Sequence, residues 1–584
     1  MSERKATRAS GGYGLLLKDS AIYGAGRMLQ KFLSALLLPL YTYFLSPADY
    51  GVLGMVLVTT ALIDVVVTLG FDVAFSRFYF DDKTEEGRNR VITNVFWIDT
   101  VYPAVVLGLL AVFMPQISNV LMKGPGYALY FQLALLNEFF TNWSDLPFTL
   151  FRLEHKPWKF SAFMFARIAI QIPLTVLLVV SFHMGVMGVL IGNAVTSFTL
   201  NAASLPTYWR RLAFKVDVDL MKKMLAFAIP AVFTALVFFI LKLSDRYFLM
   251  RYWGKTQVGL YTTAFTLSEP VYMAMTAFRM AWPQWHYAKL DDPQRHKRMV
   301  SRSSTYFMLL CVAMMTATGV FMPLLIRLLT SRQSFWSVGP TTLVLTFSTV
   351  LYSLYFVFWV GANVAKKNRQ IPLITAVASA LNVGLNLAFI PRYGMIAAAW
   401  STVAGFAVLA ALMYRISQRH YRIAFEWARL VKMGVASGLT ILAAWTVAQA
   451  TGESVRAPFG DVMLHELYKA PVALLFPLLL YALGFLTPGE RERLARAARR
   501  LRRRPAMPPA AAAGAATLGD AATFDNPPRP GARRREDAAA EAGGAETERL
   551  AAEAGGAETE RLAAEIEEDE FEDAAARDHD GETA

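Results

Sequence analysis

Residues 50–70 read YGVLGMVLVTTALIDVVVTLG, a stretch in which Asp64 is the only charged side chain. A helix needs about 20 mostly apolar residues to cross the hydrocarbon core of a bilayer, so this stretch is long enough to span a membrane. Outward from it, apolar runs of similar length, separated by charged or Pro/Gly-rich breaks, recur as far as residue 487. The sequence therefore predicts an all-α polytopic membrane protein.

The composition agrees with this prediction. Of the 584 residues, 55% are hydrophobic and 18% are charged, whereas soluble proteins average about 45–50% and about 25%. Soluble enzymes, secreted disulfide scaffolds and nucleic-acid-binding domains are poor fits to these values. The single cysteine, Cys311, permits neither an internal disulfide nor a cysteine-based metal site.

Counting the apolar runs predicts about fourteen transmembrane helices. Their boundaries, each good to a few residues, are 19–44, 49–75, 89–114, 126–149, 158–182, 185–208, 219–244, 257–281, 303–328, 338–362, 370–390, 394–416, 428–450 and 464–487.

The distribution of Lys and Arg predicts the orientation of these spans. The N-terminus and the even-numbered loops hold about 29 of these residues, and the opposite loops hold about 8. Because cytoplasmic loops are the basic ones, the N-terminus is expected inside, and an even number of spans returns the C-terminus to the same side. The opposite loops are short, so no large extracytoplasmic domain is available to hold an active site.

A weak internal repeat at an offset of about 204–210 residues predicts two similar halves. The segment 50–54, YGVLG, corresponds to the segment 258–261, VGLY. Six spans followed by six similar spans predict two lobes, and transporters often bind their substrate between such halves. The expected parts are a cytoplasmic N-terminus at 1–18, an N-lobe at 19–208, a C-lobe at 219–416, two further spans at 428–487 and a cytoplasmic tail at 488–584.

Two stretches resemble a known family. The opening SAIYG at 20–24, PLY at 39–41 and LSPADYG at 45–51, together with IPRYGMIAAA at 390–399, are similar to polysaccharide-biosynthesis and O-antigen flippases. These proteins belong to the multidrug/oligosaccharidyl-lipid/polysaccharide exporter superfamily. The resemblance covers about residues 15–487 and implies a transporter that moves undecaprenyl-diphosphate-linked oligosaccharides between leaflets. The long charged tail departs from the family pattern.

Ionisable residues placed deep in the predicted spans are the candidate site residues. A charge near the bilayer centre is costly, so such residues usually face a cavity or a partner. Cationic side chains suit a diphosphate, and the candidates for a substrate-binding cationic cavity are Arg27, Lys31, Arg167, Lys242 and Arg279. Carboxylates suit a polar cavity or ion coupling, and the candidates are Asp64, Asp99, Glu138 and Glu269.

Structural roles stay open for several of these residues. Arg279 lies near the inner end of its span and could reach the interface. Lys242 could form an ion pair with Asp245 at the outer edge of the seventh span. Glu269 could instead be a structural partner of Arg27, Lys31 or Arg167. Structural roles also stay open for Asp64, Asp99 and Glu138.

The sequence contains no signature of an enzyme. It lacks a P-loop, a Gly-x-Ser-x-Gly motif and a metal-ligand helix. We therefore expect a transporter without a cofactor or a metal, driven by an ion gradient, the membrane potential or removal of the product. A carboxylate such as Glu269 or Asp64 could carry the coupling proton or sodium ion.

The tail differs in character from the membrane part. From residue 488 onward, 22 Asp and Glu outnumber 15 Lys and Arg, and the unit AAEAGGAETERL occurs twice, at 539–550 and 551–562. Low hydrophobicity predicts a disordered segment, basic at first and then acidic. It is either dispensable or a contact for polysaccharide assembly proteins.

Together these observations predict a flippase for a lipid-linked oligosaccharide, a precursor of a surface polysaccharide such as lipopolysaccharide or exopolysaccharide, in the bacterial inner membrane. Its expected partners are this substrate and membrane lipids, with no nucleic acid. The alternatives are a lipid II flippase, a cation-coupled drug antiporter and, outside transport, a membrane glycosyltransferase or polysaccharide polymerase.

Overall fold

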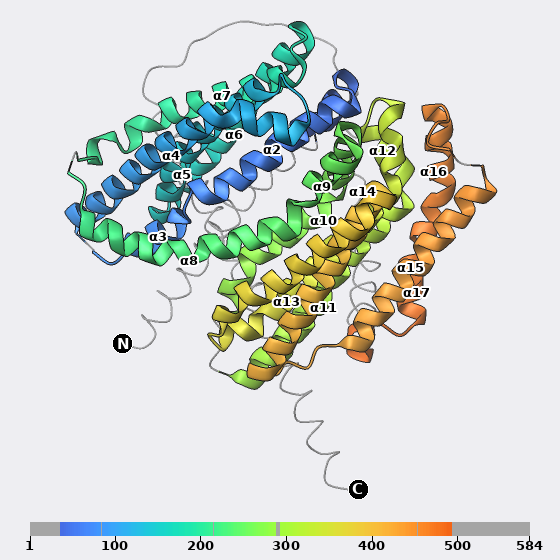
Figure 1. The fold of residues 1–584 in the computed structure, drawn as a ribbon. Coiled ribbons are helices and arrows are strands. Elements are labelled where there is room, and N and C mark those ends of the chain that lie inside the picture. The colour runs from blue at the N-terminus through green and yellow to red at the C-terminus, as the bar shows by residue number, and fades with distance from the viewer. Residues whose placement is uncertain (1–35, 83, 214, 288–291, 453, 493–584) are drawn as a thin grey trace, which may run out of the picture. The chain divides into compact units, whose positions relative to one another are not determined.

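The computed structural model describes residues 36–82, 84–213, 215–287, 292–452 and 454–492. All regular elements in these residues are helices, as the sequence predicts (Figure 1). Residues 36–44 are helical, and the helices that follow up to residue 204 are α2 Pro47–Val67, α3 Phe71–Phe78, α4 Glu85–Met122, α5 Ala128–Leu153, α6 Pro157–Val176 and α7 Gly185–Ser204.

The remaining helices run from residue 218 to residue 482. They are α8 Val218–Leu243, α9 Asp245–Trp253, α10 Lys255–Tyr287, α11 Pro293–Val320, α12 Met322–Leu329, α13 Gly339–Val364, α14 Ile371–His420, α15 Trp427–Ala450, α16 Phe459–Ala473 and α17 Leu475–Ala482. Within the described part of the chain, ten helices are long and apolar enough to cross a membrane. The multi-pass membrane fold is thus confirmed, and the count of fourteen spans stays a prediction.

Local sequence explains where α2 begins. Ser46 Oγ accepts a hydrogen bond from the amide of Asp49 at 3.2 Å, and Asp49 Oδ2 accepts one from the amide of Ser46 at 3.1 Å. This reciprocal capping box satisfies two amides that the helix leaves free, and Pro47 has the backbone angle of a first helical residue. The stretch LSPADYG, which carries the family resemblance, is therefore a helix start.

Helices α2–α7 pack on one another in one bundle, which we call the N-terminal bundle (Figure 1). Polar side chains join its helices: Ser144 Oγ donates to Asn201 Oδ1 at 3.1 Å, and Gln171 donates to Asn193 at 2.8 Å. The loop before α8 is tied back to α4, because Asn94 exchanges two 3.0 Å hydrogen bonds with the backbone of Asp217.

Helices α8–α14 form the C-terminal bundle, and single residues interrupt two of its helical runs, Ser244 between α8 and α9 and Phe321 between α11 and α12. Helix α8 ends at Leu243 and α9 begins at Asp245, so Lys242 and Asp245 lie on either side of a break at Ser244. The predicted seventh span, 219–244, agrees with the apolar helix Val218–Leu243, which is long enough to cross a membrane. In α14 the chain reverses at Gly394, whose φ of 59° suits a residue without a Cβ atom.

The two bundles meet where α2 crosses α10. A Cβ atom added to Gly259 would lie 1.8 Å from the carbonyl oxygen of Pro47, and one added to Gly51 would lie 1.9 Å from that of Lys255. Only glycine allows two backbones to approach this closely. The two segments that the repeat related, 50–54 and 258–261, therefore pack against each other.

Helices α15–α17 pack beside the C-terminal bundle, α15 along α11 and α16 against α11 and α12 (Figure 1). Glu466 and Lys469 of α16 form a buried ion pair at 3.1 Å. Each also contacts a backbone group at the break between α11 and α12: Glu466 accepts from the amide of Leu324, and Lys469 donates to the carbonyl of Val320. Thus α16 stabilises this break.

Candidate functional site

A polar cavity of about 280 Å³ lies inside the N-terminal bundle, among the ends of α2 and α5, the starts of α3 and α6, and α4. Its polar wall contains four aspartates, an amide and a guanidinium: Asp64, Asp72, Asp99, Asp145, Asn142 and Arg152. Its apolar wall contains Phe71, Phe75, Phe148 and Phe160. We call this space the N-terminal cavity.

Glu138 and Arg167 lie next to this cavity. The carboxyl group of Glu138, which is only 7% exposed, faces that of Asp64 at hydrogen-bonding range. Two carboxylates this close repel each other unless they share a proton. Arg167 interacts with Glu138 and Asp145, so its neighbours are carboxylates rather than other cations.

A second polar group lies inside the C-terminal bundle, around a small pocket lined by Lys242, Glu269, Tyr272 and Tyr352 among others. Lys242 Nζ lies 3.8 Å from the centroid of the Tyr272 ring, a favourable cation–π distance. Tyr272, Tyr352 and Tyr355 are stacked with nearly parallel rings, 6.3 and 5.8 Å apart. We call Lys242 and these three tyrosines, together with Arg279, the cation–tyrosine cluster, because the Arg279 guanidinium contacts Tyr352 and lies 6.0 Å from the Phe356 ring.

Asp245 finds a partner that the sequence did not suggest. It pairs with Arg246 at 3.3 Å, both side chains are at most 3% exposed, and Tyr261 and Thr402 also donate to its carboxylate. Arg246 in turn lies 4.6 Å from the Phe265 ring. The alternative pair of Lys242 with Asp245 is thus replaced by one between chain neighbours. The only sign of the Asp245–Arg246 pair in the sequence is that two opposite charges stand side by side next to an apolar run.

The nine predicted site residues therefore divide between the bundles. Asp64, Asp99, Glu138 and Arg167 lie in or beside the N-terminal cavity, and Lys242, Glu269 and Arg279 lie in or beside the second pocket. Arg27 and Lys31 lie outside the described residues. A single cavity that contains all five cations stays a prediction.

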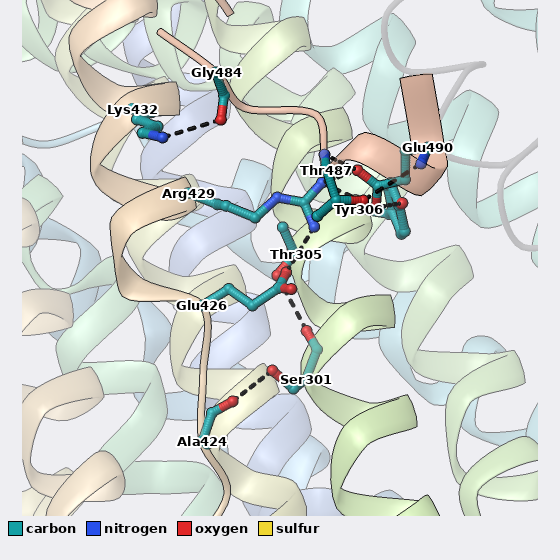
Figure 2. A network of polar contacts seen from close by, with 10 residues as sticks. All are labelled: Ser301, Thr305, Tyr306, Ala424, Glu426, Arg429, Lys432, Gly484, Thr487 and Glu490. Atoms are coloured by element: carbon teal, nitrogen blue, oxygen red, sulfur yellow. Dashed lines mark hydrogen bonds and ion pairs between the residues drawn. The ribbon is translucent and has the colours of Figure 1, made fainter. Parts of the chain in front are cut away.

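The ends of the helices carry two further polar networks. Figure 2 shows the first, in which Arg429 of α15 binds Glu426 at 3.0 Å and Glu490 at 3.0 and 3.2 Å. Lys432 of α15 donates to the carbonyl of Gly484 at 3.0 Å, and Tyr306 of α11 donates to Glu490. The network fixes the segment that follows α17 to α15 and α11.

The second network joins loops of the N-terminal bundle. Glu154 accepts hydrogen bonds from Lys156, at 2.5 Å, and from Arg211. Burial by itself raises the pKa of the Glu154 carboxyl, but these two charged donors outweigh burial and hold that pKa below its ordinary value. The loop after α5 is thereby tied to the loop after α7.

Comparisons with known proteins agree with this architecture. A family model described as "Polysaccharide biosynthesis protein" matches residues 42–338. A Lsg locus protein of Haemophilus influenzae is 24% identical over 286 residues, which cover 47% of this chain and 67% of that protein.

Solved structures share the fold. The lipid II flippase MurJ in an inward closed conformation superposes with a TM-score of 0.61 at 14% identity, covering 80% of this chain and 99% of that one. An inward-facing multidrug resistance MATE family transporter of the MOP superfamily gives a TM-score of 0.55 at 14% identity, covering 70% and 96%. A MOP superfamily transporter from Pyrococcus furiosus gives 0.52 at 13% identity, covering 72% and 96%.

The family match extends over half of the chain, from α2 through α12, and the helical architecture agrees with it. The resemblance noted in the opening stretch is thereby confirmed. This chain belongs to the polysaccharide biosynthesis protein family and has the fold of the MOP transporters.

Proposed function

We propose that this protein is a flippase that moves an undecaprenyl-diphosphate-linked oligosaccharide across the bacterial inner membrane. Two lobes, 19–208 and 219–416, would alternate access to the two sides, with both termini in the cytoplasm. Membership of a polysaccharide biosynthesis family supports the sugar part of the substrate. The similarity of the fold to that of a lipid II flippase supports a lipid-linked substrate.

The cation–tyrosine cluster is the observation that carries this proposal. A lipid-linked diphosphate sugar offers two phosphates and a set of sugar rings, so its site needs cations and aromatic faces close together. Lys242 and Arg279 supply the cations, and Tyr272, Tyr352 and Tyr355 supply the stacked rings. Ionisable side chains within membrane spans usually mark such a transport path.

The other cations have different roles in this proposal. Arg27 and Lys31, four residues apart on the first predicted span, would add positive charge to the path. Arg167 is the least suited of the five to a diphosphate, because Glu138 and Asp145 surround it. We propose that Arg167 instead balances the charge of these carboxylates.

Coupling to a proton or sodium ion is proposed for the carboxylates Asp64, Asp99, Glu138 and Glu269. The pair of Asp64 and Glu138 is the best suited, because two facing carboxyl groups can hold one proton or one cation between them. Titrating transport against external pH and sodium tests this role. Transport that responds to neither would contradict it.

A cation-coupled drug antiporter is the second candidate. The four aspartates of the N-terminal cavity favour a cationic ligand there, and MATE transporters share the fold. Against it stand the family and the cation–tyrosine cluster, which suits an anionic head group.

A deletion strain tests the proposal. The flippase account predicts loss of surface polysaccharide, with the lipid-linked precursor trapped in the inner leaflet. The double variant Lys242→Ala/Arg279→Ala should fail to restore polysaccharide although it is present in the membrane. The matched control Lys223→Ala, on an exposed face of α8, should restore it fully. Normal polysaccharide with raised drug sensitivity in the deletion strain would support the antiporter instead.

The tail, residues 488–584, has a separate proposed role. Its basic start and acidic end suit contacts with membrane lipids and with other polysaccharide assembly proteins. Deletion of residues 495–584 tests this role: unchanged polysaccharide length and amount would contradict it.

A further inference from the structure

The wall of the N-terminal cavity contains a buried hydrogen-bond donor that has no partner among the residues that the structure describes. Asn142 of α5 is 3% exposed and lines the cavity, and its Nδ2 atom makes no hydrogen bond. A buried polar group without a partner costs about 1–3 kcal/mol, so native structures nearly always satisfy such groups. The nearby Asn201 shows the usual state, since its Nδ2 donates to the carbonyl of Ser197 at 2.8 Å.

The surroundings of Asn142 define what could satisfy this donor. Asp64, Asp72, Asp99 and Asp145 place carboxyl oxygens, which accept hydrogen bonds, on the walls of the same cavity. These four carboxyl groups outnumber the one guanidinium on the wall, that of Arg152, so the wall is unfavourable for a diphosphate. The ligand must therefore accept a hydrogen bond from Asn142 and donate others to carboxylates without carrying negative charge.

Shape narrows the choice further. The cavity of about 280 Å³ lies just below the range of about 300–1,000 Å³ that holds drug-sized molecules, so it has room for a group of sugar size. It is too small for a polyprenyl chain or a whole oligosaccharide. Phe71, Phe75, Phe148 and Phe160 provide an apolar wall against which the C–H face of a sugar ring can pack.

We propose that the N-terminal cavity binds one uncharged sugar residue of the transported substrate, with Asn142 donating a hydrogen bond to it. The acceptor is a hydroxyl oxygen or the carbonyl oxygen of an acetamido group, and the aspartates accept from the O–H or N–H groups. This inference rests on the proposed flippase function and adds a sugar site to the cation–tyrosine cluster. A site that hydrogen-bonds a particular group rejects sugars that lack it, so the cavity would select among oligosaccharides.

Binding of free sugars to the purified full-length protein tests the proposal. The probes are methyl glucoside, which offers hydroxyl groups only, and N-acetylglucosamine, which adds an acetamido group. Saturation-transfer NMR on protein in detergent detects weak binding and reports which group contacts the protein. We expect at least one probe to bind, and its acetamido methyl or ring C–H protons to show which part of the sugar contacts the protein.

Variants connect the binding to Asn142. Asn142→Leu removes the donor at similar size and should weaken binding about tenfold, the equivalent of one hydrogen bond of about 1.4 kcal/mol. Asn142→Asp, which retains the shape of the side chain, should weaken sugar binding at least as much. It replaces the leucine variant in the test if that variant does not fold. The matched control is Asn137→Leu on the same helix, because Asn137 bonds Ser197 and is not part of the cavity wall. This control should bind the sugar like the wild type.

Three results would overturn the inference. In the first, neither sugar binds. In the second, the wild type and both Asn142 variants bind the sugar equally well. In the third, a lipophilic cation displaces the sugar, binds more tightly than it, and requires Asn142 for its binding. The flippase proposal fails separately. Sugar binding that depends on Asn142, in a protein that moves no lipid-linked oligosaccharide, would refute the transport role and leave the sugar site standing.

Discussion

Alanine in place of Gly259 tests whether the crossing of α2 and α10 holds the two bundles together. The added Cβ atom would lie 1.8 Å from the carbonyl oxygen of Pro47, so the helices must separate by about 1.2 Å to reach even the 3.0 Å limit of real contacts. The opposing atoms are backbone atoms, which cannot turn aside as a flexible side chain would. Gly51→Ala produces the same conflict with Lys255.

The expected cost follows from this overlap. Overpacking a close contact usually costs about 1–3 kcal/mol. If the bundles can part at this crossing, as alternating access requires, that cost falls on the packed state alone. The population of the packed state relative to the parted one should then drop by about 5- to 150-fold.

Cross-linking at the same end of the bundles measures this shift. Lys123 donates a hydrogen bond to the carbonyl of Arg251, and Lys255 donates to the Tyr127 hydroxyl at 2.6 Å, so side chains of the two bundles touch here. In a Cys311→Ser background, Lys123→Cys and Arg251→Cys should react quickly with a short bis-maleimide. Adding Gly259→Ala should slow this cross-linking at least fivefold.

The matched control is Gly108→Ala on α4, where a Cβ atom meets nothing within 4 Å. It should leave cross-linking unchanged. Unchanged cross-linking and thermal stability in both Gly51→Ala and Gly259→Ala would refute the assignment of this crossing as the contact that holds the bundles together.

Further predictions concern the polar contacts. Lys469→Ala should lower the free energy of unfolding by about 3–5 kcal/mol, because it leaves Glu466 buried without its cationic partner. The double variant Glu466→Leu/Lys469→Met should recover most of that loss. Chemical denaturation that finds the single variant as stable as the double variant would contradict this prediction. Arg429→Ala should lower the free energy of unfolding by about 1–3 kcal/mol and expose residues 484–492 to protease. Arg429→Lys should restore only part of this stability, since a lysine cannot bind Glu426 and Glu490 together. Equal digestion of the wild type and both variants would argue against the network. The pKa of Glu154 is lowered in the folded protein, so the stabilisation by its carboxylate is complete above the ordinary pKa of a glutamate and is lost as the pH falls through the lower, folded value. Melting curves should therefore show that Glu154→Gln destabilises the protein at pH 7 and has no effect in acid. A destabilisation that grows in acid would contradict this prediction.

Much of the fold could be predicted because each span is a local feature. The predicted span 428–450 agrees with α15 at Trp427–Ala450, and the predicted 338–362 agrees with α13 at Gly339–Val364. The continuation of α8 into α9 escaped prediction, since polar residues from Ser244 to Arg246 resemble a loop until their partners are known. Those partners, Tyr261 and Thr402, come from α10 and α14.

The candidate site was harder to predict for the same reason. Residue type and depth identified Asp64 and Glu138 individually, but nothing in the sequence indicates that their carboxyls face each other from α2 and α5. The stacking of Tyr272 on Tyr352 likewise joins helices 80 positions apart in the sequence. Charges and rings can be found by composition, whereas their pairing depends on how the helices pack.

Translocation by the purified protein in liposomes tests the central claim most directly. A fluorescent undecaprenyl-diphosphate oligosaccharide placed in both leaflets is quenched from outside with a membrane-impermeant reagent. Flippase activity predicts that quenching proceeds beyond the outer half, and that Lys242→Ala/Arg279→Ala stops it at that half while Lys223→Ala does not. Quenching that stops at the outer half with the wild-type protein, in liposomes where the same protein exports a lipophilic cation, would contradict the flippase account.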